Sequence, residues 1–181
     1  YGEVHYVVVR MPMVVEGQLV LEQISMFLGR DFLLTFQESP GDCWELVRSR
    51  IRNASGRMRT SGPDYLLYAL IDAVVDYYFP VLEAYGERIE LIEEHLTGSL
   101  APAVMTEIQE LRRDLLALRR VLWPMREAAG TLAREDAQAL KPDSRVYMRD
   151  CYDHTVHLLD IVDACRESTS GLFELYHLSL A

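Results

Sequence analysis

Apolar positions change their spacing along this chain, from strand-like segments near the start to helical repeats afterwards. The segments Val4 to Met11 and Gln18 to Met26 are rich in β-branched and aromatic residues, which favours strands. Asp31 to Gln37 follows after a short turn, so the second and third segments are expected to pair as a hairpin. The continuous apolar run Val7 to Val9 predicts a strand that is covered on both faces.

A short helix is predicted after these strands. Asp42 and Glu45 have the spacing of a capping box, in which each side chain bonds the backbone N–H of the other residue. The helix would run from about Cys43 to Ile51 and pack through Trp44. A basic connection containing Gly and Ser, residues 53–62, follows it.

Three long helices account for the rest of the chain. The first begins near Pro63, because a proline at the first helical position loses no hydrogen bond, and it ends at residues 97–99. A second apolar stripe of similar length, Val104 to Met125, follows after a short loop, so the two helices should lie side by side as an antiparallel hairpin. After a break at residues 133–144, a third helix runs from about Ser144 to the last residue.

These elements predict an α/β fold in which a small sheet-and-helix part is followed by three long helices. We divide the chain into an α/β part (1–58), a long helical hairpin (59–132) and a stalk helix (143–181). Because no stop signal precedes Ala181, the stalk helix is expected to continue beyond this sequence. No stretch of about 18 uncharged apolar residues occurs, so we expect no membrane span here and a soluble piece.

The net charge of the chain indicates which kinds of ligand it can bind. The chain has 28 acidic and 18 basic residues and a formal net charge of −10, which argues against nucleic acid or anionic lipid and suits cations. Its three cysteines, Cys43, Cys151 and Cys165, are odd in number and lack CxxC spacing. We therefore expect neither a disulfide framework nor a structural zinc site, and a reducing compartment fits.

The third helix carries the clearest candidate for metal chemistry. Asp150, Asp153, His154, His157 and Asp160 fall at relative positions 0, 3, 4, 7 and 10, which places all five on one helical face. Carboxylate oxygens suit hydrated Mg²⁺, and imidazole nitrogens add affinity for Co²⁺, Ni²⁺ or Zn²⁺. The alternative interpretation is a solvated polar face without a ligand.

A second carboxylate pair lies on the first long helix. Asp72 and Asp76 are four residues apart beside the apolar stripe, where an unpaired charge would be costly to bury. They are partnered by arginine, partnered by a metal, or left at a wet edge of the helix. Phosphate-binding glycine loops and a nucleophile with its base are both absent from the sequence, which makes an enzyme the weaker class.

Four segments, read in order, resemble the CorA family of magnesium and cobalt transporters. They are FLLTFQE (Phe32–Glu38), DYLLYALIDAVVDYYFPVLE (Asp64–Glu83), LRRVLWPMRE (Leu118–Glu127) and YMRDCYDHTVHLLD (Tyr147–Asp160). The resemblance implies the funnel-type cytosolic domain of an ion transporter on the cytoplasmic side of the cell membrane, with five copies around one axis. It also implies that Mg²⁺ bound between neighbouring domains favours a closed pore.

The resemblance also assigns residues. The aspartate of the family motif RDxYDH is a regulatory ligand and maps to Asp150, and the aspartate of YxLID maps to Asp72. Asp76, Asp153 and His154 are adjoining candidates. The family's membrane spans with their Gly-Met-Asn signature are expected to follow Ala181, and an N-terminal portion that supplies acidic partners is expected to precede Tyr1.

Three other functions compete with this one. A zinc-transporting relative would have the same architecture. A helical adaptor would oligomerise through its apolar stripes without metal. A metal-dependent hydrolase would use the face that carries Asp153 and His154 and would need a deep pocket there.

Overall fold

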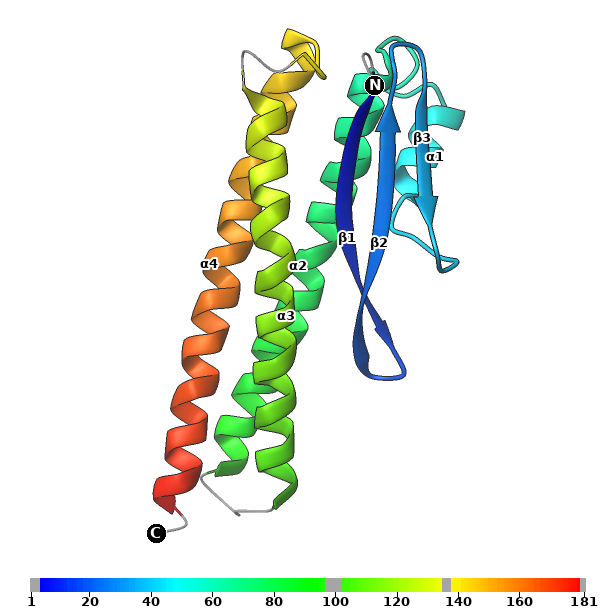
Figure 1. Ribbon diagram of the computed structural model, residues 1–181. Coiled ribbons are helices and arrows are strands. Elements are labelled where there is room, and N and C mark those ends of the chain that lie inside the picture. Colours follow the sequence, from blue (N-terminus) through cyan, green and yellow to red (C-terminus); the bar gives the residue numbers. More distant parts are fainter. Residues whose placement is uncertain (1–3, 97–101, 135–137, 180–181) are drawn as a thin grey trace.

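The computed structural model describes residues 4–96, 102–134 and 138–179, and within them a small antiparallel sheet lies beside long helices (Figure 1). This arrangement confirms the predicted α/β fold class. The division into residues 1–58, 59–132 and 143–181 stays a prediction. The elements are β1 (His5–Val15), β2 (Gln18–Leu28), β3 (Leu33–Gln37), α1 (Glu45–Arg52), α2 (Pro63–Leu96), α3 (Pro102–Ala133) and α4 (Pro142–Ser179).

The sheet has the order β1-β2-β3, and both neighbouring pairs are antiparallel. The predicted hairpin is therefore confirmed. A second hairpin joins β1 to β2 through Glu16 and Gly17, which have φ values of 51° and 78°. Positive φ at both central positions suits the right-handed twist of paired strands, and glycine adopts it without strain.

The prediction that the first strand is covered on both faces was wrong for the described residues. Val7 and Val9 are buried against the helices, but Tyr6 on the opposite face is 56% exposed. Phe36 on the same outer face of β3 is 58% exposed. The reason is that the described helices lie on one side of the sheet, so alternate side chains of β1 meet no second layer.

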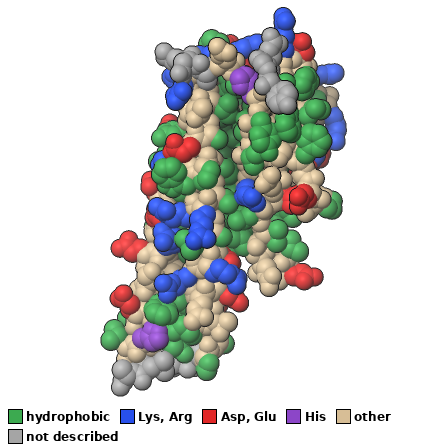
Figure 2. All heavy atoms as spheres, viewed as in Figure 1, with side chains coloured by type: hydrophobic (Ala, Val, Ile, Leu, Met, Phe, Trp, Pro, Cys, Tyr) green, Lys and Arg blue, Asp and Glu red, His purple; other side chains and the backbone are tan. Residues whose placement is uncertain are grey.

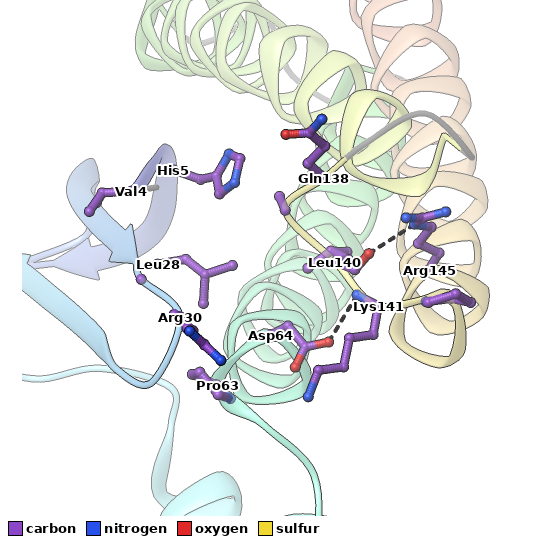
Figure 3. A pocket seen from close by; sticks show the side chains of 13 residues that line it. Val4, His5, Leu28, Arg30, Pro63, Asp64, Gln138, Leu140, Lys141 and Arg145 are labelled. Carbon is purple, nitrogen blue, oxygen red and sulfur yellow. Dashed lines mark hydrogen bonds between the residues drawn. The ribbon is translucent and has the colours of Figure 1, made fainter. Parts of the chain in front are cut away.

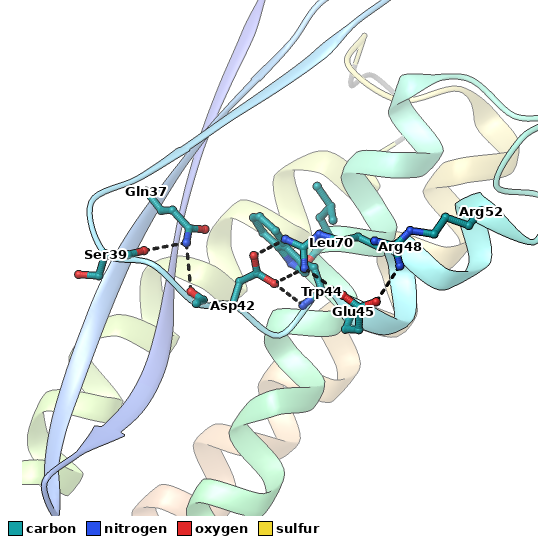
Figure 4. Close-up of polar contacts among 9 residues, drawn as sticks. Gln37, Ser39, Asp42, Trp44, Glu45, Arg48, Arg52 and Leu70 are labelled. Atoms are coloured by element: carbon teal, nitrogen blue, oxygen red, sulfur yellow. Dashed lines mark hydrogen bonds and ion pairs between the residues drawn. The ribbon is translucent and has the colours of Figure 1, made fainter.

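Helix α1 begins later than predicted because Asp42 and Glu45 do not form a capping box. Asp42 accepts a hydrogen bond from the Trp44 backbone N–H at 2.9 Å and also pairs with Arg48 (Figure 4). Glu45 instead pairs with Arg52 at 2.8 Å. The Trp44 indole N–H donates to the backbone carbonyl of Leu70 at 3.1 Å and so fixes the start of α1 on α2.

The three long helices form the predicted hairpin (α2 and α3) and stalk (α4), and α4 packs against both helices of the hairpin. Helix α4 contacts both α3 and α2 more extensively than these two contact each other. Strand β1 contacts both α2 and α3, and the Tyr78 hydroxyl of α2 donates to the Arg10 carbonyl of β1. Near the sheet, β1 and α4 each contact both α2 and α3.

The ends of α2 and α3 nearest their connection do lie together. The Tyr85 hydroxyl of α2 donates to the buried Asp114 carboxylate of α3 at 2.9 Å. Arg88 lies 3.7 Å from Glu107 across the same pair of helices. Among the described residues, α2 is the one helix long and apolar enough to cross a membrane. Leu67, Val74, Tyr78 and other apolar side chains of α2 are buried in the core, so we treat α2 as a core helix.

Helix α4 begins at Pro142, two residues before the predicted start, and the break before it agrees with the prediction. The buried Asp64 of α2 accepts the Lys141 backbone N–H at 3.1 Å and the Ser144 hydroxyl at 2.7 Å. A carboxylate there satisfies helix donors that would otherwise be unpaired and lies near the positive end of the helix. The starts of α2 and α4 are thereby held together.

Candidate metal site between two helices

Three predicted site residues come together between α2 and α4. Asp72 and Asp76 of α2 and His154 of α4 each offer one ligand atom, and these atoms lie within 4.8 Å of one another. His154 Nδ1 is 3.9 Å from an Asp76 carboxylate oxygen. The i,i+4 spacing places both aspartates on one face of α2, and the packing of α4 against that face brings in the imidazole.

Asp72 is the most enclosed of the three residues. The Tyr68 hydroxyl donates to one of its carboxylate oxygens at 3.2 Å, and the Cys151 thiol lies 3.3 Å from the other. Burial raises the pKa of the Asp72 carboxyl above its usual range, and the nearby charge of Asp76 adds to that rise. A cation here would relieve both effects, because it offsets the lost hydration and the repulsion.

Aromatic side chains of α2 pack against residues of the site and of α4. The ring of Phe79 lies edge-on to His154, with 6.1 Å between ring centroids, and 5.9 Å from the ring of His157. Tyr68 stacks on Tyr147 of α4 with 5.2 Å between centroids. These contacts restrict the imidazole and the Tyr68 hydroxyl, so the ligand positions depend on packing between the two helices.

Sequence reasoning assigned neither Tyr68 nor Cys151 to the candidate metal site. The spacing of both residues in the sequence could have indicated them. Tyr68 lies four residues before Asp72, and Cys151 lies three residues before His154, so each shares a helical face with a candidate ligand. What the sequence did not provide was the register of α4 against α2.

Of the predicted polar face on α4, only His154 belongs to the group of three possible ligands. Asp150, Asp153, His157 and Asp160 are exposed, as predicted for one polar face, and they lie outside the group formed by Asp72, Asp76 and His154. The side chains of Asp76 and His154 are themselves 60% and 49% exposed. An ion at this position would therefore keep several of its water molecules.

The donor set admits two classes of cation. Two carboxylates at a wet edge suit Mg²⁺, which prefers oxygen ligands and retains water in an octahedral shell. One imidazole nitrogen adds preference for Co²⁺, Ni²⁺ or Zn²⁺. The residues present therefore fit a hydrated divalent cation, and the imidazole is the group that would discriminate between metals.

Comparison with known proteins agrees on one family. The family described as CorA-like Mg²⁺ transporter protein matches residues 1–181. The cobalt/magnesium transport protein CorA of Thermotoga maritima is 38% identical over 164 residues, which are 91% of this chain and 47% of that protein. The chain thus spans about half the length of that relative.

Solved structures show the same fold. The complete structure of the CorA magnesium transporter from Methanocaldococcus jannaschii has a TM-score of 0.86 at 20% identity, over 98% of this chain and 56% of that one. The ZntB cytoplasmic domain from Vibrio parahaemolyticus has a TM-score of 0.78 at 11% identity, over 96% of this chain and 68% of that one.

The soluble domain of CorA from Methanocaldococcus jannaschii matches with a TM-score of 0.86 at 19% identity, over 96% of this chain and 70% of that one. At this identity the likeness shows the fold alone. The match of the family over the whole length and the identity to the Thermotoga protein show more: the chain belongs to the CorA family of Mg²⁺ transporter proteins.

Proposed function

We propose that this chain is the cytosolic, ion-sensing part of a divalent-cation transporter for Mg²⁺ and Co²⁺. The observation that carries the proposal is the convergence of Asp72, Asp76 and His154 from two helices within 4.8 Å. The printed name of the Thermotoga relative, a cobalt/magnesium transport protein, supports these cations. The match covers about half of the Thermotoga protein. We therefore assign ion conduction to the whole transporter and not to this chain.

The proposed action of the ion is to link α2 to α4. Without a cation, Asp72 and Asp76 repel each other and the buried charge of Asp72 is unfavourable. A bound cation reverses both effects and favours the arrangement in which His154 lies against α2. A ligand shifts such an equilibrium only by its difference in affinity for the two arrangements, and this site supplies that difference.

Asp150 and Asp153 have a separate role in this proposal. Both are exposed on α4 and lie outside the intrachain group, so they are free to face a neighbouring copy. In the proposed pentamer, cations between copies would draw such carboxylates together and favour a closed pore. The intact protein is then placed at the cell membrane, with this part on its cytoplasmic side and α4 leading toward the membrane spans.

One observation favours a second cation. The imidazole of His154 is a better ligand for Zn²⁺ than for Mg²⁺, and the fold is also that of a ZntB cytoplasmic domain. A zinc transporter is therefore the second candidate function. The helical adaptor remains the metal-independent alternative.

The deciding experiment is thermal unfolding of this chain with Mg²⁺, Co²⁺ and Zn²⁺ at constant ionic strength. Ligands that bind only the folded state raise the unfolding temperature in a saturable way. We expect Asp72→Asn to abolish the rise with every cation, and His154→Gln to abolish the rise with Co²⁺ and Zn²⁺ more than the rise with Mg²⁺. Asp160→Asn, an exposed carboxylate change on the same helix, is the matched control and should leave the rise intact.

Two results would contradict cation sensing at this site, and a third would change the cation. An unfolding temperature that ignores all three cations would favour the metal-independent adaptor. A rise that Asp160→Asn removes as completely as Asp72→Asn would mean that the cations act on overall acidity and not at this site. A rise with Zn²⁺ that far exceeds the rise with Mg²⁺ would favour the zinc transporter.

A further inference from the structure

A pocket of about 610 Å³ lies apart from the metal site, where the starts of β1, α2 and α4 meet the turn after β2. Figure 3 shows its side chains: Leu28 and Arg30 approach from the sheet, and Leu140 and Lys141 from the segment before α4. Pockets of this volume accept small organic molecules. Neither the family match nor the metal proposal assigns a ligand to it.

The charge of the pocket is opposite to that of the chain. Its lining contains three side chains with a fixed positive charge, Arg30, Lys141 and Arg145, and one acid, Asp64. The chain as a whole carries a formal charge of −10. A concentration of positive charge on an acidic protein raises the local concentration of anions.

Two of these cations have unengaged charged ends. Arg145 donates its Nε–H to the Leu140 carbonyl at 2.9 Å. Among the described residues, neither the Arg30 guanidinium nor the Lys141 ammonium has an ion-pair or hydrogen-bond partner. Asp64 forms no ion pair with the Lys141 ammonium in the described structure; its Oδ2 accepts the Lys141 backbone N–H and the Ser144 hydroxyl.

The Lys141 ammonium lies next to Gly62. A Cβ at Gly62 would lie 3.0 Å from Lys141 Nζ and 2.8 Å from an Asp64 carboxylate oxygen. The absence of a side chain at Gly62 therefore leaves the room that the ammonium occupies.

The other lining residues suit an organic body. Val4, Leu28 and Leu140 provide apolar walls, and His5 and Gln138 lie across the pocket from each other (Figure 3). These two side chains can donate and accept hydrogen bonds. The lining therefore has a doubly cationic part, an apolar part and a hydrogen-bonding part.

We propose that this pocket binds a small organic phosphate of about nucleotide size. The phosphate would lie between Arg30 and Lys141, because a dianion matches two unpaired cations and the guanidinium fork suits phosphate oxygens. The organic part would lie along Leu28 and Leu140 and reach His5 and Gln138. The site is independent of the metal site, so each proposal can fail without the other.

Isothermal titration of this chain at constant ionic strength tests the proposal, with AMP, inorganic phosphate, adenosine and succinate as probes. We expect saturable binding of AMP, weaker binding of inorganic phosphate and none of adenosine. Arg30→Gln and Lys141→Gln should each weaken AMP binding by about tenfold or more, since each removes a charge-assisted hydrogen bond. Lys141→Arg should retain it.

The control is Arg50→Gln, which removes an exposed positive charge on α1 away from the pocket and should leave AMP binding unchanged. The proposal is overturned if AMP gives no saturable heat at millimolar concentration, or if Arg50→Gln weakens it as much as Arg30→Gln. Succinate that binds as tightly as AMP would overturn the assignment to phosphate. Circular dichroism of each variant distinguishes lost binding from lost folding.

Discussion

Asp42 illustrates how a single side chain can set both local structure and acid sensitivity. Its carboxylate accepts the Trp44 N–H and pairs with Arg48, and this pairing lowers the pKa of Asp42 below its usual range. A lowered folded-state pKa contributes stability that is present above the unfolded pKa of about 4 and is lost as the pH falls through the folded value.

We therefore expect Asp42→Asn to lower the free energy of unfolding at pH 7 by about 1 kcal/mol, because the Arg48 partner is 42% exposed and solvent screens the ion pair. The amide still accepts the Trp44 N–H but loses the ion pair with Arg48. The difference from wild type should shrink as the pH falls below about 4, because protonation removes the same charge. Urea unfolding of both proteins across this pH range measures it. A difference that persists unchanged at low pH would contradict the account.

Two helical glycines, Gly86 and Gly130, differ in the space around them and can be compared by substitution. A Cβ at Gly86 would meet no atom within 4 Å, whereas a Cβ at Gly130 would lie 3.1 Å from the ring of Tyr152. Alanine in a helix is favoured over glycine by about 1 kcal/mol. We expect Gly86→Ala to raise the free energy of unfolding by about that amount, and Gly130→Ala to gain less because Tyr152 must move. Chemical denaturation of the two variants tests the order, and the reverse order would refute it.

At the scale of elements, the buried hydrogen bond between Tyr85 and Asp114 joins α2 to α3. Tyr85 donates to the buried Asp114 carboxylate at 2.9 Å, and Arg113 lies 3.1 Å from the other oxygen of Asp114. Replacing one partner leaves the other without its bond in a buried position. This hydrogen bond stabilises the packing of α2 on α3 at the end where the two helices lie together.

Tyr85→Phe should therefore lower the free energy of unfolding by about 1–3 kcal/mol. Tyr85→Phe combined with Asp114→Leu should cost less than the sum of the two single changes, because both remove the same interaction. Tyr77→Phe, at an exposed tyrosine of the same helix, is the control and should be nearly neutral. Additive costs in the double variant would show that the hydrogen bond does not couple the helices.

At the scale of the whole molecule, negative charge opposes self-association. The chain carries a formal charge of −10, and the exposed face of α4 contributes Asp150 and Asp153. Figure 2 shows Lys and Arg side chains gathered over the middle of the long helices on the face in view, with acidic side chains mainly toward its edges. Copies that meet through α4 would bring like charges together unless a cation lay between them.

We expect the sedimentation mass of this chain to increase with Mg²⁺ and not with NaCl at the same ionic strength. Screening by salt weakens all exposed charges equally, whereas a bound divalent ion reverses the repulsion at its own site. Asp150→Asn should reduce the Mg²⁺-dependent increase. Equal masses in Mg²⁺ and in a chelator would count against association through this face.

The sequence predicted the long helices because their apolar spacing is dense and regular. Pro63 and the residues around Pro142 indicated helix starts to within about two residues, since proline and capping chemistry act locally. The capping box at Asp42 failed because Arg48 and Arg52 compete for the same carboxylates once α1 has formed. Local patterns could not weigh that competition.

The candidate metal site was also predictable only in part from the sequence. The sequence by itself determined which carboxylates and imidazoles share a helical face, because helical periodicity fixes neighbours three and four residues apart. Only the tertiary structure decided that His154 joins Asp72 and Asp76 while Asp150 and Asp153 do not. That choice depends on the register and rotation of α4 against α2, which many weak packing contacts set together and no local pattern encodes.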